Sequence, residues 1–399
     1  MLVEGKKPSD LRKIAYLGIL LLGTVSLTGD VVYEGARGVL PDFLMFLGAN
    51  LAIVSLVSGL SDFLGYVMRL VGGYFADKTR AYWFFIFIGY GLIVALPLLG
   101  SLGMFGLEAA VILVLLERMG KALRSPSRDA VLSIVSKGVG AGKAFGLHEL
   151  LDQVGAIIGP SLVATLMFIS ANNYSFTFTL LFIPFSILLV VLTYAYRKIG
   201  KTAITEKQKT GKKSFLEKQF YIYTLAVLLN TMGLIPYSVI LGKASSILKP
   251  LGGQWIIPIM YMFIQAVDAL AAPISGYAYD KFKTKILVAP FLLSIIPSLL
   301  PFINTNLSLL WVAAAFFGFI LGMHESIYRA AISDFTSIAS RGTAYGIFNA
   351  AYGLGFLISG SLYGLLMALE APFTLLACYI IVIQISAVIL LSKVWRTKH

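Results

Sequence analysis

Long apolar runs separated by short polar breaks extend along almost the whole chain. Most runs hold about 20 residues or more, the length at which an α-helix crosses the hydrocarbon core of a bilayer. The breaks predict twelve helices, at residues 14–46, 50–76, 81–101, 105–136, 142–169, 173–196, 219–247, 253–278, 285–302, 306–337, 342–368 and 372–393. We therefore expect an all-α integral membrane protein with twelve transmembrane helices.

The composition favours a membrane protein over an ordinary soluble domain. Hydrophobic residues make up 58% of the chain and charged residues 13%, and the mean hydropathy is +0.86. A soluble domain holds roughly a quarter charged residues. The single cysteine, Cys378, excludes an intramolecular disulfide and a cysteine-based metal cluster. Since there are also only three histidines, the sequence predicts neither a metal site nor a cofactor.

The positive charge is unevenly distributed among the predicted loops. The net charge is +13, and Lys and Arg gather on one set of loops, whereas the opposite loops hold only Lys243 and Lys249. Because positively charged loops stay in the cytoplasm, we expect a multi-pass protein of the plasma membrane with both termini cytoplasmic. The charge then indicates topology and contact with the lipid bilayer, and it does not indicate nucleic-acid binding.

An internal repeat relates the two halves of the chain. The segment Ala144–Gly146 recurs as Ala344–Gly346, Gly155 matches Gly355, and Arg128 matches Arg329. A unit with an even number of helices returns to the side where it started, so the two copies should have parallel topology. We predict two pseudo-symmetric six-helix bundles, 1–196 and 219–399, joined by a basic cytoplasmic linker, 197–218.

Two charged turns carry the clearest resemblance to a known family. The sequence GYFADKTR follows the second predicted helix, and GYAYDK follows the eighth. The first turn resembles the signature loop of the major facilitator superfamily, and the second resembles its weaker partner. The resemblance implies that these turns act as a cytoplasmic latch between the halves. The latch residues are Gly73, Asp77, Lys78, Arg80, Gly276, Asp280 and Lys281.

Each latch residue type has a physical reason to be there. A glycine at position 73 lets two helices approach closely, and Asp77 can face the positive N-terminal end of a neighbouring helix.

In the fifth predicted helix, 142–169, Gly155, Gly159 and Pro160 resemble the antiporter motif of the superfamily. The segment 118–135 resembles a branch that contains many exporters of drugs and small molecules. These resemblances favour export.

Three ionisable residues share one face of the first predicted helix. Asp30, Glu34 and Arg37 stand at i, i+4 and i+7, and charged groups at membrane depth are costly and usually functional. Removal from water beside a second carboxylate raises the affinity of a carboxylate for a proton. Asp30 or Glu34 is therefore the predicted proton carrier. The alternative is a structural ion pair of Glu34 with Arg37, with Asp30 held by helix 4.

Further charges lie in helices 4 and 5. Arg118 and Lys121 are deep in helix 4 and are expected to face the cavity, where they either hold an acid of helix 1 or attract an anion. Nearer the cytoplasm, we expect gate-forming or structural ion pairs. These ion pairs would join Arg124 or Arg128 of the fourth predicted helix, 105–136, to Glu149 or Asp152 of the fifth, 142–169.

The second half carries fewer charges. Glu325 and Arg329 stand at i and i+4, which predicts a local ion pair. His324 is read as a packing histidine, with a proton relay as the alternative. The expected cavity wall in this half is aromatic and amide-rich and would suit an amphipathic substrate; it comprises Asn230, Tyr237, Gln265, Asp268, Asn349 and Tyr352.

These features predict a monomeric proton-coupled secondary transporter that works by alternating access. The leading hypothesis is an exporter, or antiporter, of small amphipathic or drug-like compounds. The alternative is a proton-linked transporter of small organic anions, with Arg118 and Lys121 as the anion contacts. The sequence shows no motif of a serine hydrolase, zinc protease or nucleotide-binding loop, so we expect neither an enzyme nor ATP-driven transport. A channel is a further alternative.

Overall fold

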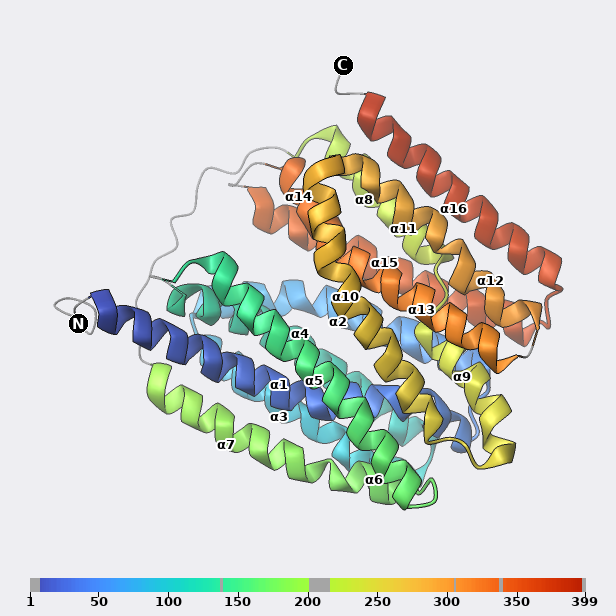
Figure 1. Ribbon diagram of the computed structural model, residues 1–399, viewed down its shortest axis with the longest axis horizontal. Helices are drawn as coiled ribbons and strands as arrows, with labels where there is room; N and C mark the ends of the chain where they lie inside the picture. Colours follow the sequence, from blue (N-terminus) through green and yellow to red (C-terminus); the bar gives the residue numbers. More distant parts are fainter. Residues whose placement is uncertain (1–7, 137–138, 201–215, 305, 337–339, 397–399) are drawn as a thin grey trace. The chain divides into compact units, whose positions relative to one another are not determined.

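The computed structural model describes residues 8–136, 139–200, 216–304, 306–336 and 340–396, and these residues form helices and turns without a strand. Most of the predicted linker, 201–215, lies outside the described residues. The chain divides into two compact units (Figure 1). Unit 1 comprises Met1–Arg37 and Met68–Lys209, and unit 2 comprises Gly38–Val67 and Thr210–His399. The first two helices thus contribute to both units.

Unit 1 is built from the beginning of α1, the end of α2 and the helices up to α7. A series of 3-10 turns at 92–95, 97–100 and 102–105 follows α3. The bounds are α1 Pro8–Phe46, α2 Leu51–Thr79, α3 Tyr82–Gly91, α4 Leu107–Val135, α5 Ala141–Ile169, α6 Tyr174–Leu180 and α7 Phe182–Ile199.

Unit 2 contains the remaining helices together with the end of α1 and the beginning of α2. A π-helical turn, η7, lies between α13 and α14. The bounds are α8 Lys218–Gly233, α9 Tyr237–Leu248, α10 Ile256–Phe282, α11 Val288–Leu293, α12 Ile295–Ile303, α13 Leu307–Met323, η7 His324–Tyr328, α14 Arg329–Asp334, α15 Arg341–Ala368 and α16 Phe373–Arg396.

Small residues explain why residues 38–67 belong to unit 2. The Ser55 hydroxyl donates to the carbonyl of Gly360 at 2.9 Å. A Cβ added to Gly59 would lie 2.6 Å from the carbonyl oxygen of Phe356. The backbones of α2 and α15 therefore touch directly, as small residues permit between membrane helices.

Glycines likewise bring α5 against α1 in unit 1. A Cβ on Gly155 would lie 2.6 Å from the Leu27 carbonyl oxygen, and one on Gly159 would lie 2.6 Å from that of Val31. The contacts advance along both helices in the same direction, so α1 and α5 run parallel. This arrangement fixes the register between Asp30 on α1 and the residues of α5.

Several helices expected to be continuous are broken. The predicted helix 219–247 is divided into α8 and α9 ahead of Tyr237, with Pro236 at the break. The predicted helix 285–302 becomes α11 and α12, each containing proline. The predicted helix 81–101 continues from α3 into 3-10 turns that include Pro97. Proline lacks an N–H and disfavours helix in the preceding residue, which accounts for these corrections.

Ten stretches among the described residues are long and apolar enough to cross a membrane. They include Ala15–Phe46 and Leu51–Thr79 in the first half and Arg341–Ala368 and Phe373–Val394 in the second. One stretch, Ile256–Ile303, extends over 48 residues, about twice what a single crossing needs. The molecule is therefore a multi-pass membrane protein.

Candidate functional site

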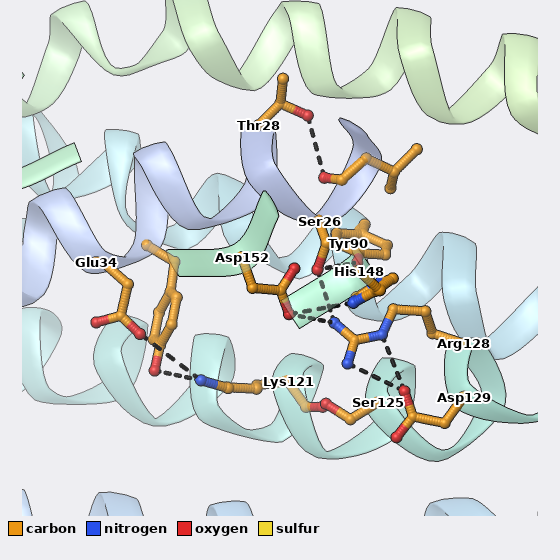
Figure 2. Close-up of polar contacts among 12 residues, drawn as sticks. Ser26, Thr28, Glu34, Tyr90, Lys121, Ser125, Arg128, Asp129, His148 and Asp152 are labelled. Carbon is orange, nitrogen blue, oxygen red and sulfur yellow. Dashed lines mark hydrogen bonds and ion pairs between the residues drawn. The ribbon is translucent and has the colours of Figure 1, made fainter. Parts of the chain in front are cut away.

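Buried and half-buried charged residues of α1, α4 and α5 form two polar clusters in unit 1, parts of which Figure 2 shows. Asp30 interacts electrostatically with members of both clusters. The first, the Tyr33 cluster, comprises Tyr33, Glu34 and Arg37 of α1 with Glu117, Arg118, Lys121 and Arg124 of α4. The second, the Arg128 cluster, comprises Ser26, Tyr90, Arg128, Asp129, His148 and Asp152.

Three cations donate hydrogen bonds to the hydroxyl oxygen of Tyr33, which is completely buried. Arg37 Nη1 lies at 2.8 Å, Arg118 Nη1 at 3.1 Å, and Lys121 Nζ is also within hydrogen-bond distance. Lys121 Nζ lies 4.0 Å from the centroid of the ring, and Arg124 Cζ lies 5.8 Å from it. The ring therefore also takes part in cation–π contacts.

Glu34 lies beside the same cations at a longer distance. Its carboxylate oxygens are 3.8 Å from Lys121 Nζ and 3.8 Å from Arg37 Nη1, and the residue is buried. Figure 2 shows the pair formed by Glu34 and Lys121. The structure thus contains both partners considered for Glu34, the arginine on its own helix and the lysine of α4.

Asp30 occupies the position between the two clusters and is half-buried. Its Cβ would be 2.9 Å from a Cβ placed on Gly155 of α5. The charged neighbours that act on it are Asp152, Lys121, Glu34 and Arg124. Asp30 is therefore close enough to feel a change of charge in either cluster.

Glu117 holds two of the arginines of α4. Its carboxylate lies 3.6 Å from Arg124 Nη2 and 3.8 Å from Arg118 Nε, and all three side chains are almost fully buried. Arg124 also donates to the carbonyl of Gly89 at 3.2 Å. Of the two arginines that the sequence offered as partners for α5, Arg124 is therefore held by an acid on its own helix, two turns away.

Arg128 makes the contact with α5. Its guanidinium lies 3.4 Å from Asp152 and 3.0 Å from Asp129, and it donates to Ser26 Oγ at 2.7 Å. His148 Nδ1 lies 3.5 Å from the same Asp152 carboxylate. The sequence left Glu149 and Asp152 open as partners, and the structure selects Asp152, while Glu149 is exposed.

The two predicted latch turns adopt similar backbone conformations. Arg80 has φ of 56° and Lys283 has φ of 52°, each directly after the end of α2 or α10. Asp77 accepts a hydrogen bond from the Tyr82 hydroxyl at 3.0 Å. The repeat found in the sequence therefore extends to the geometry of these turns.

The glycine expected to allow close helix packing at the first turn is a different one. A Cβ on Gly73 would meet Pro126 only at an ordinary 3.6 Å, whereas one on Gly72 would lie 3.2 Å from Leu123 Cα. Gly72 therefore makes the closest approach to α4, and the role given to Gly73 is corrected. In the second turn, Gly276 lies beside Ser326, and the charged residues Lys78, Asp280 and Lys281 lie at the ends of α2 and α10.

In unit 2, the expected cavity residues are mostly buried among neutral partners. Asn230 donates to Gln384 at 2.8 Å and to Ser294 at 3.2 Å, and accepts from the Tyr328 hydroxyl at 2.7 Å. It is fully buried. The side-chain amide of Asn230 is therefore hydrogen-bonded within unit 2.

The remaining predicted residues of unit 2 lie in two groups. Tyr237 packs on Tyr261 with ring centroids 5.3 Å apart, and Gln265 and Asp268 are buried on α10. The hydroxyl oxygen of Tyr352 lies 2.8 Å from Nδ1 of His324. Asn349, which stands one turn before Tyr352 on α15, is half-buried.

The π-helical turn changes the spacing expected around His324. The His324 ring stacks on Tyr328 at 4.3 Å, which agrees with its interpretation as a packing histidine. Glu325 and Arg329 are both exposed, and Glu325 lies within the π-helical turn that ends just before Arg329. A π-helix bonds residues five apart, so the ion pair expected from the i, i+4 spacing of these two residues stays a prediction.

Two members of the network were not given a role from the sequence. Tyr33 lies between Asp30 and Glu34 and one turn before Arg37, so its place on the charged face was a usable signal. Glu117 stands seven residues before Arg124, which also places both on one face of α4. Among the described residues, no group of His, Cys, Asp and Glu is arranged to hold a metal ion.

Comparison with known proteins identifies relatives over nearly the whole chain. Residues 224–399 match the family described as Major Facilitator Superfamily. An uncharacterized protein of Mycobacterium tuberculosis is 32% identical over 393 residues, which covers 95% of this chain and 93% of that protein. An uncharacterized MFS-type transporter of Methanocaldococcus jannaschii is 29% identical over 365 residues, with 90% of each chain covered.

Solved structures share the fold at low sequence identity. The nucleoside transporter NupG superposes with a TM-score of 0.69 at 14% identity, covering 94% of this chain and 98% of that chain. A POT family transporter in complex with a thioalcohol-conjugated peptide gives a TM-score of 0.71 at 14% identity, covering 96% of each chain. At such identities the likeness concerns architecture alone.

Proposed function

Because the chain belongs to the major facilitator superfamily, we propose that this transporter is proton-coupled and works by alternating access. The observation that carries the proposal is the ion pair of the buried Glu34 with the half-buried Lys121, next to Asp30. Ionisable groups inside a membrane are costly and mark proton and substrate pathways. One proton on Glu34 would break this ion pair, so the pair is suited to coupling proton binding to a change of conformation.

The proposed coupling acts through charge. A proton on Asp30 or Glu34 removes one negative charge from the network, and Lys121 then loses an ionic partner. A ligand or proton shifts a conformational equilibrium only by its difference in affinity for the two states. In this proposal, the state with a protonated acid and the state with an intact ion pair face opposite sides of the membrane.

The proposed topology has twelve crossings in two six-helix bundles, 1–196 and 219–399. The ten candidate spans reach this number if Ile256–Ile303 crosses twice and if α4 also crosses. The charges of α4 exclude it from a count based on hydropathy, although its 29 residues are long enough. We further propose a monomer in the plasma membrane with both termini cytoplasmic, and latch and gate roles for the residues predicted above.

Export of amphipathic or drug-like compounds by antiport is the first substrate hypothesis. It rests on the resemblance of the Gly155 to Pro160 segment to the antiporter motif. The close contact of Gly155 and Gly159 with the backbone of α1 supports a mechanical role of this segment near Asp30. The aromatic residues of unit 2 are compatible with an amphipathic substrate.

A specific observation favours the second hypothesis, transport of small organic anions. Arg37, Arg118 and Lys121 all donate to one oxygen atom, that of Tyr33. Arg124 is also within cation–π distance of the same ring. Such a concentration of cations repels a lipophilic cation and attracts a carboxylate or phosphate group.

Proteoliposomes that enclose a pH-sensitive dye test the proton coupling. A panel of amphipathic dyes, carboxylates and phosphate esters is added outside, and internal pH is followed. We expect at least one compound to cause proton flux, which Asp30→Asn or Glu34→Gln reduces at least tenfold. Glu108→Gln, an exposed acid at the start of α4, is the control and should keep full flux. Equal substrate flux in all variants, without proton movement, would overturn the proposal.

A further inference from the structure

Two buried polar groups of unit 2 have no hydrogen-bond partner among the described residues. They are the hydroxyl of Ser238 on α9 and the side-chain carbonyl oxygen of Gln265 on α10. Ser238 is 2% exposed and Gln265 is 6% exposed. A buried hydroxyl or amide without a partner has lost its hydrogen bonds to water and gained none in return. Such groups are uncommon in folded proteins, and each calls for an explanation.

Other buried residues of the same types in unit 2 are fully hydrogen-bonded. Gln384 accepts from the side chain of Asn230 at 2.8 Å and donates to its backbone carbonyl at 3.0 Å. Ser298 accepts from a backbone N–H at 3.0 Å and donates to a backbone carbonyl at 3.2 Å, both at the break between α8 and α9. The two unpartnered groups therefore depart from the pattern of their own unit.

Both groups flank one pair of aromatic rings. Ser238 directly follows Tyr237, and Gln265 stands one turn after Tyr261 on the same face of α10. The ring centroids of Tyr237 and Tyr261 lie 5.3 Å apart, and the ring of Phe317 on α13 lies 6.3 Å from that of Tyr237. The polar groups thus come from two different helices and border the same aromatic surface.

The end of α1, which belongs to unit 2, meets α9 and α10 at this place. A Cβ on Gly38 would lie 3.3 Å from the ring of Tyr261. Ser238 shares a face of α9 with Ser245, seven residues later, and the Ser245 hydroxyl donates to the carboxylate of Asp42 on α1. The faces of α9 and α10 that carry the unpartnered groups are therefore both turned toward one junction with α1.

We propose that Ser238 and Gln265 bind a neutral hydroxyl or amide group of the transported compound, whose apolar part packs beside Tyr237 and Tyr261. The inference rests on the proposed transport function and specifies its first substrate hypothesis, an amphipathic compound. A serine hydroxyl and a glutamine amide each donate and accept hydrogen bonds and carry no charge, so a neutral group that also does both satisfies them. Asp268, further along α10, has interactions of its own and is not part of this site.

Thermal unfolding of the ligand-free protein tests whether the fold itself needs the two groups. We expect Gln265→Met and Ser238→Ala each to raise the unfolding midpoint by about 1–3 °C, because each replaces an unpartnered polar group with an apolar one. Gln384→Met and Ser298→Ala, the matched hydrogen-bonded residues, should lower the midpoint. A lower midpoint in both Gln265→Met and Ser238→Ala would show that these groups hold the fold together, and it would overturn the inference.

Binding of a matched series of compounds tests the chemistry of the site. The probes are phenylacetamide, phenethyl alcohol, phenylacetate, phenethylammonium and ethylbenzene, which share one ring and differ in the attached group. Their affinities are measured by saturation-transfer NMR on protein in nanodiscs, with empty nanodiscs as the blank. We expect the amide and the alcohol to bind at least about tenfold more tightly than the hydrocarbon and the two ions.

The variants show whether Gln265 sets this preference. In Gln265→Met, the preference for the amide and the alcohol over ethylbenzene should fall about tenfold, since the hydrogen bond to the ligand is lost. A residue that only supports the fold would weaken all five compounds together. Ser246→Ala, at an exposed position of α9, is the control and should keep the preference.

Three results would overturn the inference. They are tighter binding of either ion than of the neutral compounds, equal affinity for the amide, the alcohol and ethylbenzene, and absence of binding by both neutral compounds. A failure of the proposed function gives a different result. If the neutral compounds bind with a preference that depends on Gln265, and no compound causes proton flux in the liposome assay, the proposed proton coupling is wrong and this site stands.

Discussion

The two units use related helix arrangements but bury different chemistry. In unit 1, Gly155 of α5 lies against the backbone of α1, and in unit 2 its repeat partner Gly355 lies against α8, where an added Cβ would be 2.7 Å from Thr231. Unit 1 buries a cluster of cations and carboxylates around its crossing, whereas unit 2 buries the neutral network of Asn230 and separate carboxylates, Asp42 and Asp268. The comparison indicates that close helix packing is common to both copies, and that the ionisable groups on which we base coupling belong to unit 1.

Loss of a central cation should have the largest effect. We expect Lys121→Gln to reduce transport at least about 30-fold, since it removes a cationic partner of the buried Glu34 carboxylate, a loss that costs about 2 kcal/mol or more. Initial flux in proteoliposomes, normalised to folded protein, measures it. The exposed Lys218→Gln variant is the control. Flux within threefold of the parent would remove Lys121 from the site.

A mutation in the neutral network of unit 2 should lower the stability of the protein and leave its proton coupling unchanged. We expect Asn230→Ala to lower the free energy of unfolding by about 1–3 kcal/mol, because it leaves buried partners such as Gln384 and Tyr328 unsatisfied. Thermal unfolding measures this effect. The pH dependence of flux per folded molecule should stay the same, and a changed pH dependence would break the contrast between the units.

The repeat-related glycines provide a matched pair for the same contrast. Gly155→Ala and Gly355→Ala should each cost about 1–3 kcal/mol of stability through overpacking. We expect only Gly155→Ala to alter the pH dependence of transport, since its added methyl group meets Asp30. Parallel measurements of thermal unfolding and pH-dependent flux separate the two effects. An equal shift in the pH profile of both variants would contradict our assignment of coupling to unit 1.

The smallest effect on stability is expected at the first latch turn. Asp77 is exposed, and an asparagine there can still accept from Tyr82, so Asp77→Asn should change the free energy of unfolding by less than about 0.5 kcal/mol. The latch hypothesis predicts a several-fold slower flux with unchanged ligand affinity. Unchanged flux would leave this turn with a topological role only.

The sequence predicted the helical, multi-pass character because apolar length acts over many residues. The placement of Asp30, Glu34 and Arg37 on one face of α1 followed from their spacing, whereas the orientation and the two six-helix halves stay predictions. Helix continuity was less predictable, since the break before Tyr237 depends on a single proline within an apolar run. The outcome at such a proline is decided by tertiary packing.

The centre of the candidate site was harder to predict from the sequence. Aromatic residues are common in membrane helices, so the place of Tyr33 on the charged face of α1 did not by itself show that three cations would donate to its hydroxyl. The partner of Arg124 was also missed, because Glu117 satisfies it within α4. Which of several nearby acids pairs with a given arginine depends on side-chain distances, and the spacing of residues along the sequence does not give these distances.

The corners after α2 and α10 bear on how such a chain is oriented during synthesis. Arg80 and Lys283 both have left-handed backbone conformations, in which residues other than glycine are strained by about 1 kcal/mol. Glycine would relieve that strain but would remove a cation, and cations in loops favour retention on the cytoplasmic side. In the orientation that we propose, the positive charge at both corners favours correct insertion at the cost of this backbone strain.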